Sequence, residues 1–184
     1  MARPLAKDHE NKRRLILQRA ATVFAEEGFD RASVARVAQA CEISKANIYH
    51  YYTSKDEILF DILDNYLSGL RDRICQQPET GTPEQQFHAV LLDILLAYQG
   101  ADNEHRLQAS SIRHLPEFQQ AILRGYQRDL VTHVNRKIAP LAPGLARKPA
   151  KLHATTMSVF GMLNWYYMWN PKADAGARKD YANV

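Results

Sequence analysis

Several features that define other protein classes are scarce in this sequence of 184 residues. Only two cysteines occur, Cys41 and Cys75, and their separation fits no metal or redox motif, so we expect buried thiols in a reducing compartment. The longest apolar runs are interrupted by polar residues well short of the span that a membrane helix needs. The opening residues, MARPLAKDHENKRR, contain no apolar stretch like that of a secretory signal. We therefore expect a cytoplasmic protein that makes no membrane contact.

The motifs of catalytic and metal-binding proteins are also missing. Seven histidines occur, but there is no HExxH motif, and no two of them stand four residues apart with an acidic partner. His105 and His114 could share a metal with a carboxylate, although histidines on the surface or in hydrogen bonds are far commoner. There is no glycine-rich phosphate loop and no serine, histidine and aspartate in a catalytic order. The sequence therefore predicts no enzyme, no catalytic residue, no metal and no cofactor.

Positive charge is concentrated near the start of the chain. The net charge is +4, and residues 1–19 alone hold six basic residues against two acidic ones, so the remaining residues are balanced. A basic segment of this kind attracts phosphate when it adjoins a DNA-reading element. The alternative is a solvated, frayed terminus. The six basic residues are Arg3, Lys7, Lys12, Arg13, Arg14 and Arg19.

Apolar residues recur at intervals of three and four along most of the chain, which is typical of amphipathic helices. No segment alternates with the period of two expected of a strand, so the sequence predicts an all-α fold. Helix ends are signalled by Gly28-Phe29, by Ser33 and Ser44, by the Ser54-x-x-Glu57 capping box, and by Thr82-Pro83. The expected helices cover residues 10–27, 33–41, 45–52, 54–76, 82–99, 104–114, 116–139 and 149–169, with a further short helix opening near 177.

The segment from Ser33 to Lys55, SVARVAQACEISKANIYHYYTSK, is typical of a helix-turn-helix. Its first helix carries apolar residues at helical spacing, and Glu42-Ile43-Ser44 forms the turn. Ser44 is a good N-cap for a second helix that is dense in long polar and aromatic side chains. In a helix-turn-helix the first helix braces the second, which places its N-terminal residues against base edges in the major groove.

This segment resembles the DNA-binding domain of TetR-family transcriptional regulators, and the resemblance extends over residues 10–60. Glu42 stands where the family usually has glycine, so we expect it at positive φ at a cost of about 1 kcal/mol. The resemblance implies an N-terminal three-helix helix-turn-helix domain over residues 1–55 and a C-terminal helical bundle for ligand binding and dimerisation over residues 56–184. The matching positions are Ser33-Val34, Val37-Ala38, Ile43-Ser44, Ile48-Tyr49, Tyr51-Tyr52, Ser54-Lys55 and Ile58-Leu59.

The resemblance also implies which residues meet double-stranded DNA. Lys45 favours guanine, Asn47 pairs with adenine, and Ala46 suits a thymine methyl group. Tyr49, Tyr51 and Lys55 are expected to hold phosphates, which position the domain without reading sequence. Tyr52 stands at the family's core phenylalanine and is expected to pack inside. The DNA-binding prediction comprises Ser33, Ser44, Lys45, Ala46, Asn47, Tyr49, His50, Tyr51 and Lys55.

One short recognition helix buries too little surface for useful affinity, so we expect a homodimer on a palindromic operator, with recognition helices about 34–36 Å apart or a multiple of that distance. The expected dimer face is the helix over 149–169, where Gly161 would allow a close approach of helices. The helix expected to open near residue 177 ends after about two turns. Either the chain is cut short there, or the dimer interface depends more heavily on residues 150–169. The predicted face comprises Met157, Phe160, Gly161, Leu163 and Asn164.

Residues 80–170 mix apolar, aromatic and polar side chains, as a small-molecule site does, although core packing explains any one of them equally well. The FGMLNWYYMWNP stretch and the Arg113-His114-Leu115-Pro116 run resemble those of TetR-family regulators that respond to acyl-CoA thioesters, whose phosphates would suit Arg106, Arg113 or Arg124. The predicted ligand site comprises Tyr98, Arg106, Ser110, Arg113, Phe118, Tyr126, Phe160, Asn164, Trp165 and Trp169.

The resulting hypothesis is a nucleoid-associated repressor that leaves its operator when a small hydrophobic effector, with acyl-CoA as the candidate, binds the C-terminal helices. Two other classes stay open on the sequence alone. One is a DNA-binding structural factor without a ligand, whose C-terminal helices bind a protein partner. The other is a small enzyme with an incidental helix-turn-helix.

Overall fold

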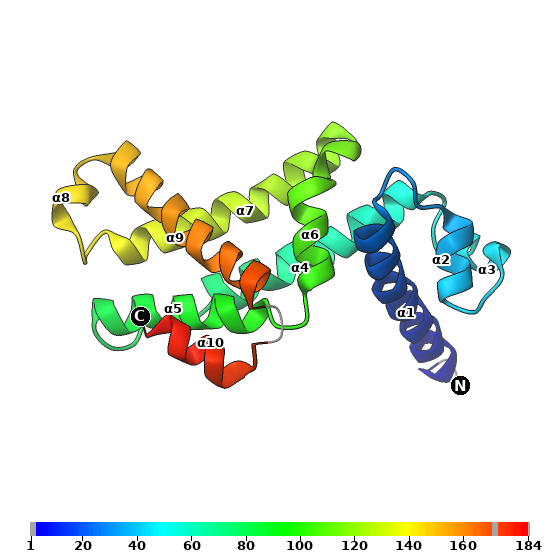
Figure 1. Cartoon of the computed structure of the whole chain (residues 1–184), viewed down its shortest axis with the longest axis horizontal. Helices are drawn as coiled ribbons and strands as arrows, with labels where there is room; N and C mark the ends of the chain where they lie inside the picture. The colour runs from blue at the N-terminus through cyan, green and yellow to red at the C-terminus, as the bar shows by residue number, and fades with distance from the viewer. Residues whose placement is uncertain (1–2, 171–172, 184) are drawn as a thin grey trace. The chain divides into compact units, whose positions relative to one another are not determined.

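The computed structural model describes residues 3–170 and 173–183, with the side chains of residues 3–7 and 167 left out. Within these ranges the chain forms ten α-helices and one short 3-10 helix, and no strand (Figure 1). The all-α prediction is confirmed. No helix among the described residues is both long enough and apolar enough to cross a membrane.

The chain divides into two compact units. The first unit combines residues 1–66 with residues 103–123. It contains α1 (Arg3–Glu27), α2 (Val34–Ala40), α3 (Lys45–Tyr49), the start of α4 (Lys55–Cys75), α6 (Asp102–Ser110), the 3-10 helix η1 (Ile112–His114) and the start of α7 (Glu117–Ile138). α1 packs on α2, and α2 packs on α3. The buried side chains of this three-helix part include Ile16, Ala20, Phe24, Val37, Ala38 and Ile48.

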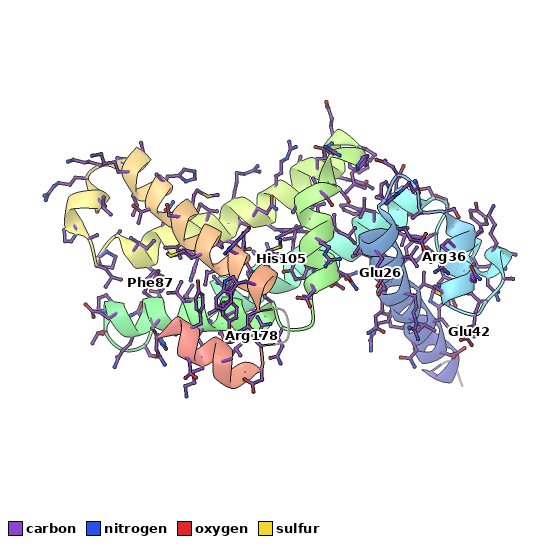
Figure 2. The ribbon with its side chains drawn as sticks, in the orientation of Figure 1. Glu26, Arg36, Glu42, Phe87, His105 and Arg178 are labelled. Carbon is purple, nitrogen blue, oxygen red and sulfur yellow. The ribbon has the colours of Figure 1, made fainter. Side chains whose placement is uncertain are left out.

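The turns of the first unit follow the predicted signals. Gly28 ends α1 at a φ of +83°, and the rings of Phe24 and Phe29 meet edge to face across it, with their centroids 5.2 Å apart. Ser33 caps α2 by accepting a hydrogen bond from the Arg36 N–H at 3.2 Å. Glu42 lies in the turn between α2 and α3 at a φ of 57°, so the predicted positive φ is confirmed (Figure 2). These local conformations fix the angle at which α3 leaves the domain.

The predicted capping box at the start of α4 is half right. The Glu57 N–H donates to the Ser54 hydroxyl at 3.1 Å, as predicted. The Glu57 carboxylate, however, accepts from the Thr53 N–H at 2.6 Å and from the Thr53 hydroxyl at 2.8 Å instead of from Ser54. A complete capping box is found at α5, where Thr82 and Gln85 bond reciprocally. Both arrangements satisfy N–H groups that a helix start leaves open.

The second unit comprises residues 67–102 and 124–184. It contains the rest of α4 and α7, together with α5 (Pro83–Ala97), α8 (Pro143–Ala146), α9 (Pro149–Trp169) and α10 (Ala175–Ala182). The segment 140–148 was expected to be a loop, but residues 143–146 form the short helix α8. The core draws on α4, α5, α7 and α9 through Leu70, Ile74, Ile94, Leu95, Val134, Leu163 and Tyr166.

α10 is held on α5 by a buried arginine. Arg178 is 1% exposed, and its Nη1 donates to the Leu95 carbonyl at 3.0 Å while its Nε donates to the Ala173 carbonyl at 3.2 Å (Figure 2). The guanidinium also lies 5.7 Å from the centroid of the Tyr166 ring. A buried charge is tolerated only when its hydrogen bonds are satisfied, so Arg178 fixes the position of this short helix.

Both cysteines are free thiols. Cys41 is buried and Cys75 is half-buried, and burial raises the pKa of each. A thiol with a raised pKa is a poor nucleophile and a poor metal ligand, because both roles require the thiolate. Cys41 therefore behaves as a small apolar residue of the first unit.

Candidate nucleic-acid interface

α3 presents its polar side chains to solvent while one apolar residue anchors it. Ile48 is completely buried, and the Ser44 hydroxyl caps the helix by accepting from the Asn47 N–H at 3.2 Å. The helix ends at Tyr49, three residues earlier than predicted, and His50 is its C-cap. The exposed residues on and beside it are Ser44, Lys45, Ala46, Asn47, Tyr49 and His50.

The exposed groups suit a groove of DNA. The Lys45 ammonium lies 5.5 Å from the centroid of the Tyr49 ring, and Tyr49 is 47% exposed. An ammonium and an amide beside an apolar methyl group offer donors and acceptors for base edges. Ser33 and Ser44 each use an oxygen lone pair as a helix cap and keep an O–H donor, which suits a phosphate oxygen. The roles of these residues on DNA stay predictions, but their placement satisfies what such roles require.

The three tyrosines after Ile48 have different positions. Tyr49 is exposed, whereas the half-buried Tyr51 ring lies 4.6 Å from the His9 ring, centroid to centroid. Tyr52 is buried, as predicted, and its hydroxyl donates to Asp61 at 2.6 Å. Burial, with the hydrogen bond and charge of Asp61, raises the pKa of Tyr52 well above its usual value. Tyr52 therefore stabilises the domain as a neutral side chain.

Lys55 makes contacts inside the domain. Its ammonium donates to the backbone carbonyls of Phe29, Asp30 and Ala32 at 2.8, 3.2 and 3.3 Å. The same group lies 4.5 Å from the centroid of the Phe29 ring. An ammonium has three N–H donors, and here each has an acceptor. Lys55 thus ties the α1–α2 loop to the start of α4 through the same ammonium that was predicted to hold a phosphate.

The basic segment of α1 is partly neutralised within the protein. Arg13 donates to the Asp61 carboxylate, the same group that accepts from Tyr52. Lys12 pairs with Asp8 at 2.8 Å. Arg14 and Arg19 are exposed and make no ion pair among the described residues, whereas the side chains of Arg3 and Lys7 lie outside the described set. The charge left for phosphate is therefore smaller than the sequence alone implies.

The residues predicted to line an effector site are divided between the two units. The first unit contains Arg106, Ser110, Arg113 and Phe118, all of them exposed. The second unit contains Tyr98, Tyr126, Phe160, Asn164, Trp165 and Trp169. Trp165 and Trp169 are 63% and 57% exposed, so neither is enclosed within the second unit.

Two of the predicted effector-site residues are hydrogen-bonded to each other inside the second unit. The buried Tyr98 hydroxyl donates to the Asn164 side-chain oxygen at 2.9 Å, and burial raises the pKa of Tyr98. Phe160 packs into the core, and the Arg71 guanidinium lies 4.9 Å from the centroid of the Tyr126 ring. An apolar pocket of about 250 Å³ occurs in the same unit, between α5, α9 and α10. It is lined by Phe87, Leu91, Leu95, Val159, Met162, Leu163, Tyr181 and Ala182, none of which was predicted to line the effector site.

α6 is hydrogen-bonded to α1 and α4 within the first unit. The Asn103 amide donates to the Thr22 hydroxyl on α1 at 3.1 Å. The Tyr66 hydroxyl on α4 and the His105 Nδ1 lie 3.0 Å apart, and their rings meet edge to face. Spacing along the sequence gives no sign of either contact, because it does not show that α6 returns to α1.

η1 contacts the α1–α2 loop, which precedes the Ser33 cap. The His114 Nδ1 lies 3.3 Å from an Asp30 carboxylate oxygen, and the His114 and Phe29 ring centroids are 5.4 Å apart. The sequence left His114 open as a metal ligand, but its ring lies beside the Asp30 carboxylate, the Phe29 ring and the Arg113 guanidinium. No group of three potential ligands suited to a metal ion occurs in the part of the chain that the structure describes.

α9 exposes an unusually apolar face, which we call the α9 face: Met157, Gly161, Met162, Trp165, Met168 and Trp169. A methyl group added at Gly161 would meet nothing within 4 Å. The predicted dimer face was partly wrong, because Phe160 and Leu163 are buried in the core while Trp165 and Trp169 point outward. Large exposed apolar patches commonly mark protein interfaces.

Comparisons with known proteins agree with this architecture. The family described as "Bacterial regulatory proteins, tetR family" matches residues 16–62, and the family described as "Tetracyclin repressor-like, C-terminal domain" matches residues 80–173. A solved TetR-family transcriptional regulator from Bordetella parapertussis 12822 is 32% identical, with 94% of this chain and 92% of that chain covered and a TM-score of 0.87.

Two further relatives are more distant. AibR, solved in complex with isovaleryl coenzyme A and operator DNA, is 20% identical over 92% of this chain and 95% of its own, and its TM-score of 0.76 indicates the same fold. The uncharacterized regulator YuxN of Bacillus subtilis strain 168 is 27% identical over 132 residues, which are 68% of this chain and 44% of that protein. The chain thus spans less than half the length of this curated relative. Because both parts of the chain match and the helix-turn-helix is present, the protein belongs to the TetR family of bacterial regulatory proteins.

Proposed function

We propose that this protein is a transcriptional repressor that binds a palindromic operator as a homodimer and is released by a small hydrophobic effector. The observation that carries the proposal is the exposure of Lys45, Asn47 and Tyr49 on a helix anchored by the buried Ile48. A recognition helix needs this combination of a fixed backbone and free side chains. Residues 1–55 would bind DNA, and residues 56–184 would bind the effector and the second copy.

The α9 face supports the dimer. Met157, Met162, Trp165, Met168 and Trp169 are each about half or more exposed. Leaving several large apolar side chains in water is unfavourable by roughly 25 cal/mol per Å², and a second copy packed on the same face would remove that cost. Glycine in mid-helix costs about 1 kcal/mol relative to alanine, and among the described residues no atom lies within 4 Å of a methyl group added at Gly161. A closely approaching partner helix would explain it.

We further propose that the effector is an acyl-CoA thioester. AibR is a fold relative solved with isovaleryl coenzyme A, and the sequence stretch FGMLNWYYMWNP resembles that of acyl-CoA-responsive regulators. An acyl chain would suit the apolar helices of residues 56–184, while its CoA phosphates would favour Arg106, Arg113 or Arg124. Binding must favour the DNA-free conformation, because a ligand with equal affinity for both conformations shifts nothing. α6 and η1, with their contacts to Thr22 and Asp30, would transmit that preference to the helix-turn-helix.

The test is a gel shift of the protein on the DNA upstream of its own gene, with a series of acyl-CoA thioesters added. A repressor would shift a DNA fragment that contains one palindrome, and acyl-CoA thioesters of one range of chain lengths would abolish the shift. Scattered binding that ignores every thioester would instead indicate a structural DNA-binding factor with a protein partner. Sedimentation of the complex would give two protomers per site. Titration calorimetry in which no acyl-CoA binds would remove the effector class while leaving DNA binding intact.

A further inference from the structure

An open pocket of about 320 Å³ lies in the second unit where α5 begins and α7 ends. It is not part of the effector site predicted from the sequence. Its lining residues come from the loop before α5, from the first turn of α5, from the end of α7 and from the segment that follows α7. They are Glu79, Pro83, Gln86, Arg136, Lys137 and Pro140. Four of the six are polar or charged, so electrostatics decides what this pocket accepts.

Lys137 is a buried cation with an exposed partner. The residue is 7% exposed, and its ammonium donates to Glu79 at 2.6 Å and to the Gln86 side-chain oxygen at 3.0 Å. A buried ammonium must be paired with an anion, because burying it alone is very costly. The Glu79 side chain, however, is 72% exposed. The carboxylate that neutralises Lys137 can therefore move into water when another anion takes its place.

Arg136 adds a second positive charge. It lines the same pocket, it is exposed, and it makes no hydrogen bond or ion pair within the described residues. Its guanidinium can bind a carboxylate or a phosphate with two parallel hydrogen bonds. Two cations against the single carboxylate of Glu79 leave the lining with an excess of positive charge.

His133 lies one turn before Lys137 on the same face of α7. It is 7% exposed, and its Nε2 is buried without a hydrogen-bond partner. Burial, followed by the charges of Lys137 and Arg136, lowers the pKa of His133, so the ring is neutral near pH 7 and adds no charge beside the pocket. The start of α5 adds the partial positive charge of a helix N-terminus. Glu84 in that turn is engaged by its own backbone and by Thr82.

We propose that this pocket binds a small anionic molecule through a carboxylate or phosphate group. The anion pairs with Arg136 and Lys137 and displaces the Glu79 carboxylate. Glu79 lies in the loop between α4 and α5, so its displacement releases that loop from α7. The site is separate from the operator and from the proposed hydrophobic effector, and its occupancy is measured without either of them.

Titration calorimetry of the full chain at constant ionic strength tests the site, with inorganic phosphate and succinate as separate probes. The Arg136→Gln variant is expected to bind about tenfold more weakly or worse, since a charge-assisted hydrogen bond is lost. The Glu79→Gln variant is expected to bind about tenfold more tightly, because the internal competitor has lost its charge. Arg147→Gln, at an exposed arginine outside the pocket lining, serves as the matched control and should behave as the wild type.

Both altered side chains in the pocket are exposed, but Glu79→Gln leaves the buried Lys137 ammonium without its anion, so the folding of each variant is checked by circular dichroism before the titration. Binding of phosphate alone would assign a phosphate ligand, and binding of succinate alone would assign a carboxylate. The proposal is overturned if neither probe binds saturably to the wild type or to Glu79→Gln. It is equally overturned if Arg136→Gln and Arg147→Gln weaken binding to the same extent, since that result means general charge attraction and no site.

Discussion

Replacing Lys55 with methionine tests whether its ammonium stabilises the domain or contacts a DNA phosphate. Methionine keeps the apolar stem but removes the ammonium, so the carbonyls of Phe29, Asp30 and Ala32 lose their donor. The contacts at Phe29 and Ala32 are part-buried, and each orphaned carbonyl costs about 1 kcal/mol, whereas water replaces the donor at the exposed Asp30. Loss of the cation above the Phe29 ring adds about 0.5 kcal/mol. The expected destabilisation is about 2–3 kcal/mol.

Thermal unfolding followed by circular dichroism measures this loss at one fixed protein concentration. For a protein of this size each kcal/mol lowers Tm by about 2–4 °C, so Lys55→Met should melt about 5–10 °C below the wild type. Lys45→Met is the matched control. Its side chain is exposed and its ammonium lies beside the Tyr49 ring, so its Tm should change by less than about 2 °C.

Operator binding as a function of salt supplies an independent measurement. Removing a lysine that neutralises one phosphate lowers the slope of log K against log salt by about 0.9. Lys55→Met should leave the slope unchanged, because the ammonium is used inside the domain. A variant that melts with the wild type but loses about one unit of slope would refute the structural role, and Lys55 would then be a phosphate ligand, as the sequence resemblance implied.

Three further outcomes are expected. Asn47→Ala should weaken operator binding by about 1–3 kcal/mol at a single base position, measured with operator variants, while Gln39→Ala on α2 should not change base preference. Trp165→Lys should give monomers in sedimentation experiments, whereas Phe118→Lys, at a similarly exposed apolar side chain outside the α9 face, should leave the dimer intact. Burial and the charges of Lys137 and Arg136 depress the pKa of His133 in the folded state. The contribution of His133 to the free energy of unfolding is therefore complete above pH 6.5 and is lost as the pH drops through the folded-state pKa. The Tm of His133→Gln should depend less on pH across that window.

The ends of helices were predictable because their signals are local. Gly28, Ser33, Glu42, Ser44 and Thr82 each act through backbone groups within a few residues of themselves. Such signals survive whatever the rest of the chain does, and their predicted conformations were confirmed. The capping box at α4 was predicted only in part. The Glu57 carboxylate accepts from Thr53 and not from Ser54, and the sequence does not determine which of two neighbouring donors lies closer to it.

The sequence of α9 does not show which face of this helix packs against the core. Apolar residues occur on every side of this helix, so periodicity does not distinguish the core face from an exposed one. Phe160 and Leu163 were expected on a dimer surface but are buried, while Trp165 and Trp169 were expected in a ligand site but are exposed. Only the packing of α4, α5 and α7 against one side decides the matter. The exposed tryptophans then become the stronger evidence for a second copy.

The loop from Gly28 to Ser33 shows why contacts between distant segments could not be predicted from the sequence. Lys55 meets it from 26 residues away, and His114 of η1 reaches Asp30 and Phe29 from a segment much later in the chain. Neither contact has a periodic or spacing signal. Yet the loop ends at Ser33, whose hydroxyl caps α2 and keeps one donor for phosphate. A displacement of η1 would therefore act on the backbone that places Ser33, without needing to distort α3 itself. The α1–α2 loop is therefore a direct physical connection within the first unit between η1 and a predicted DNA contact.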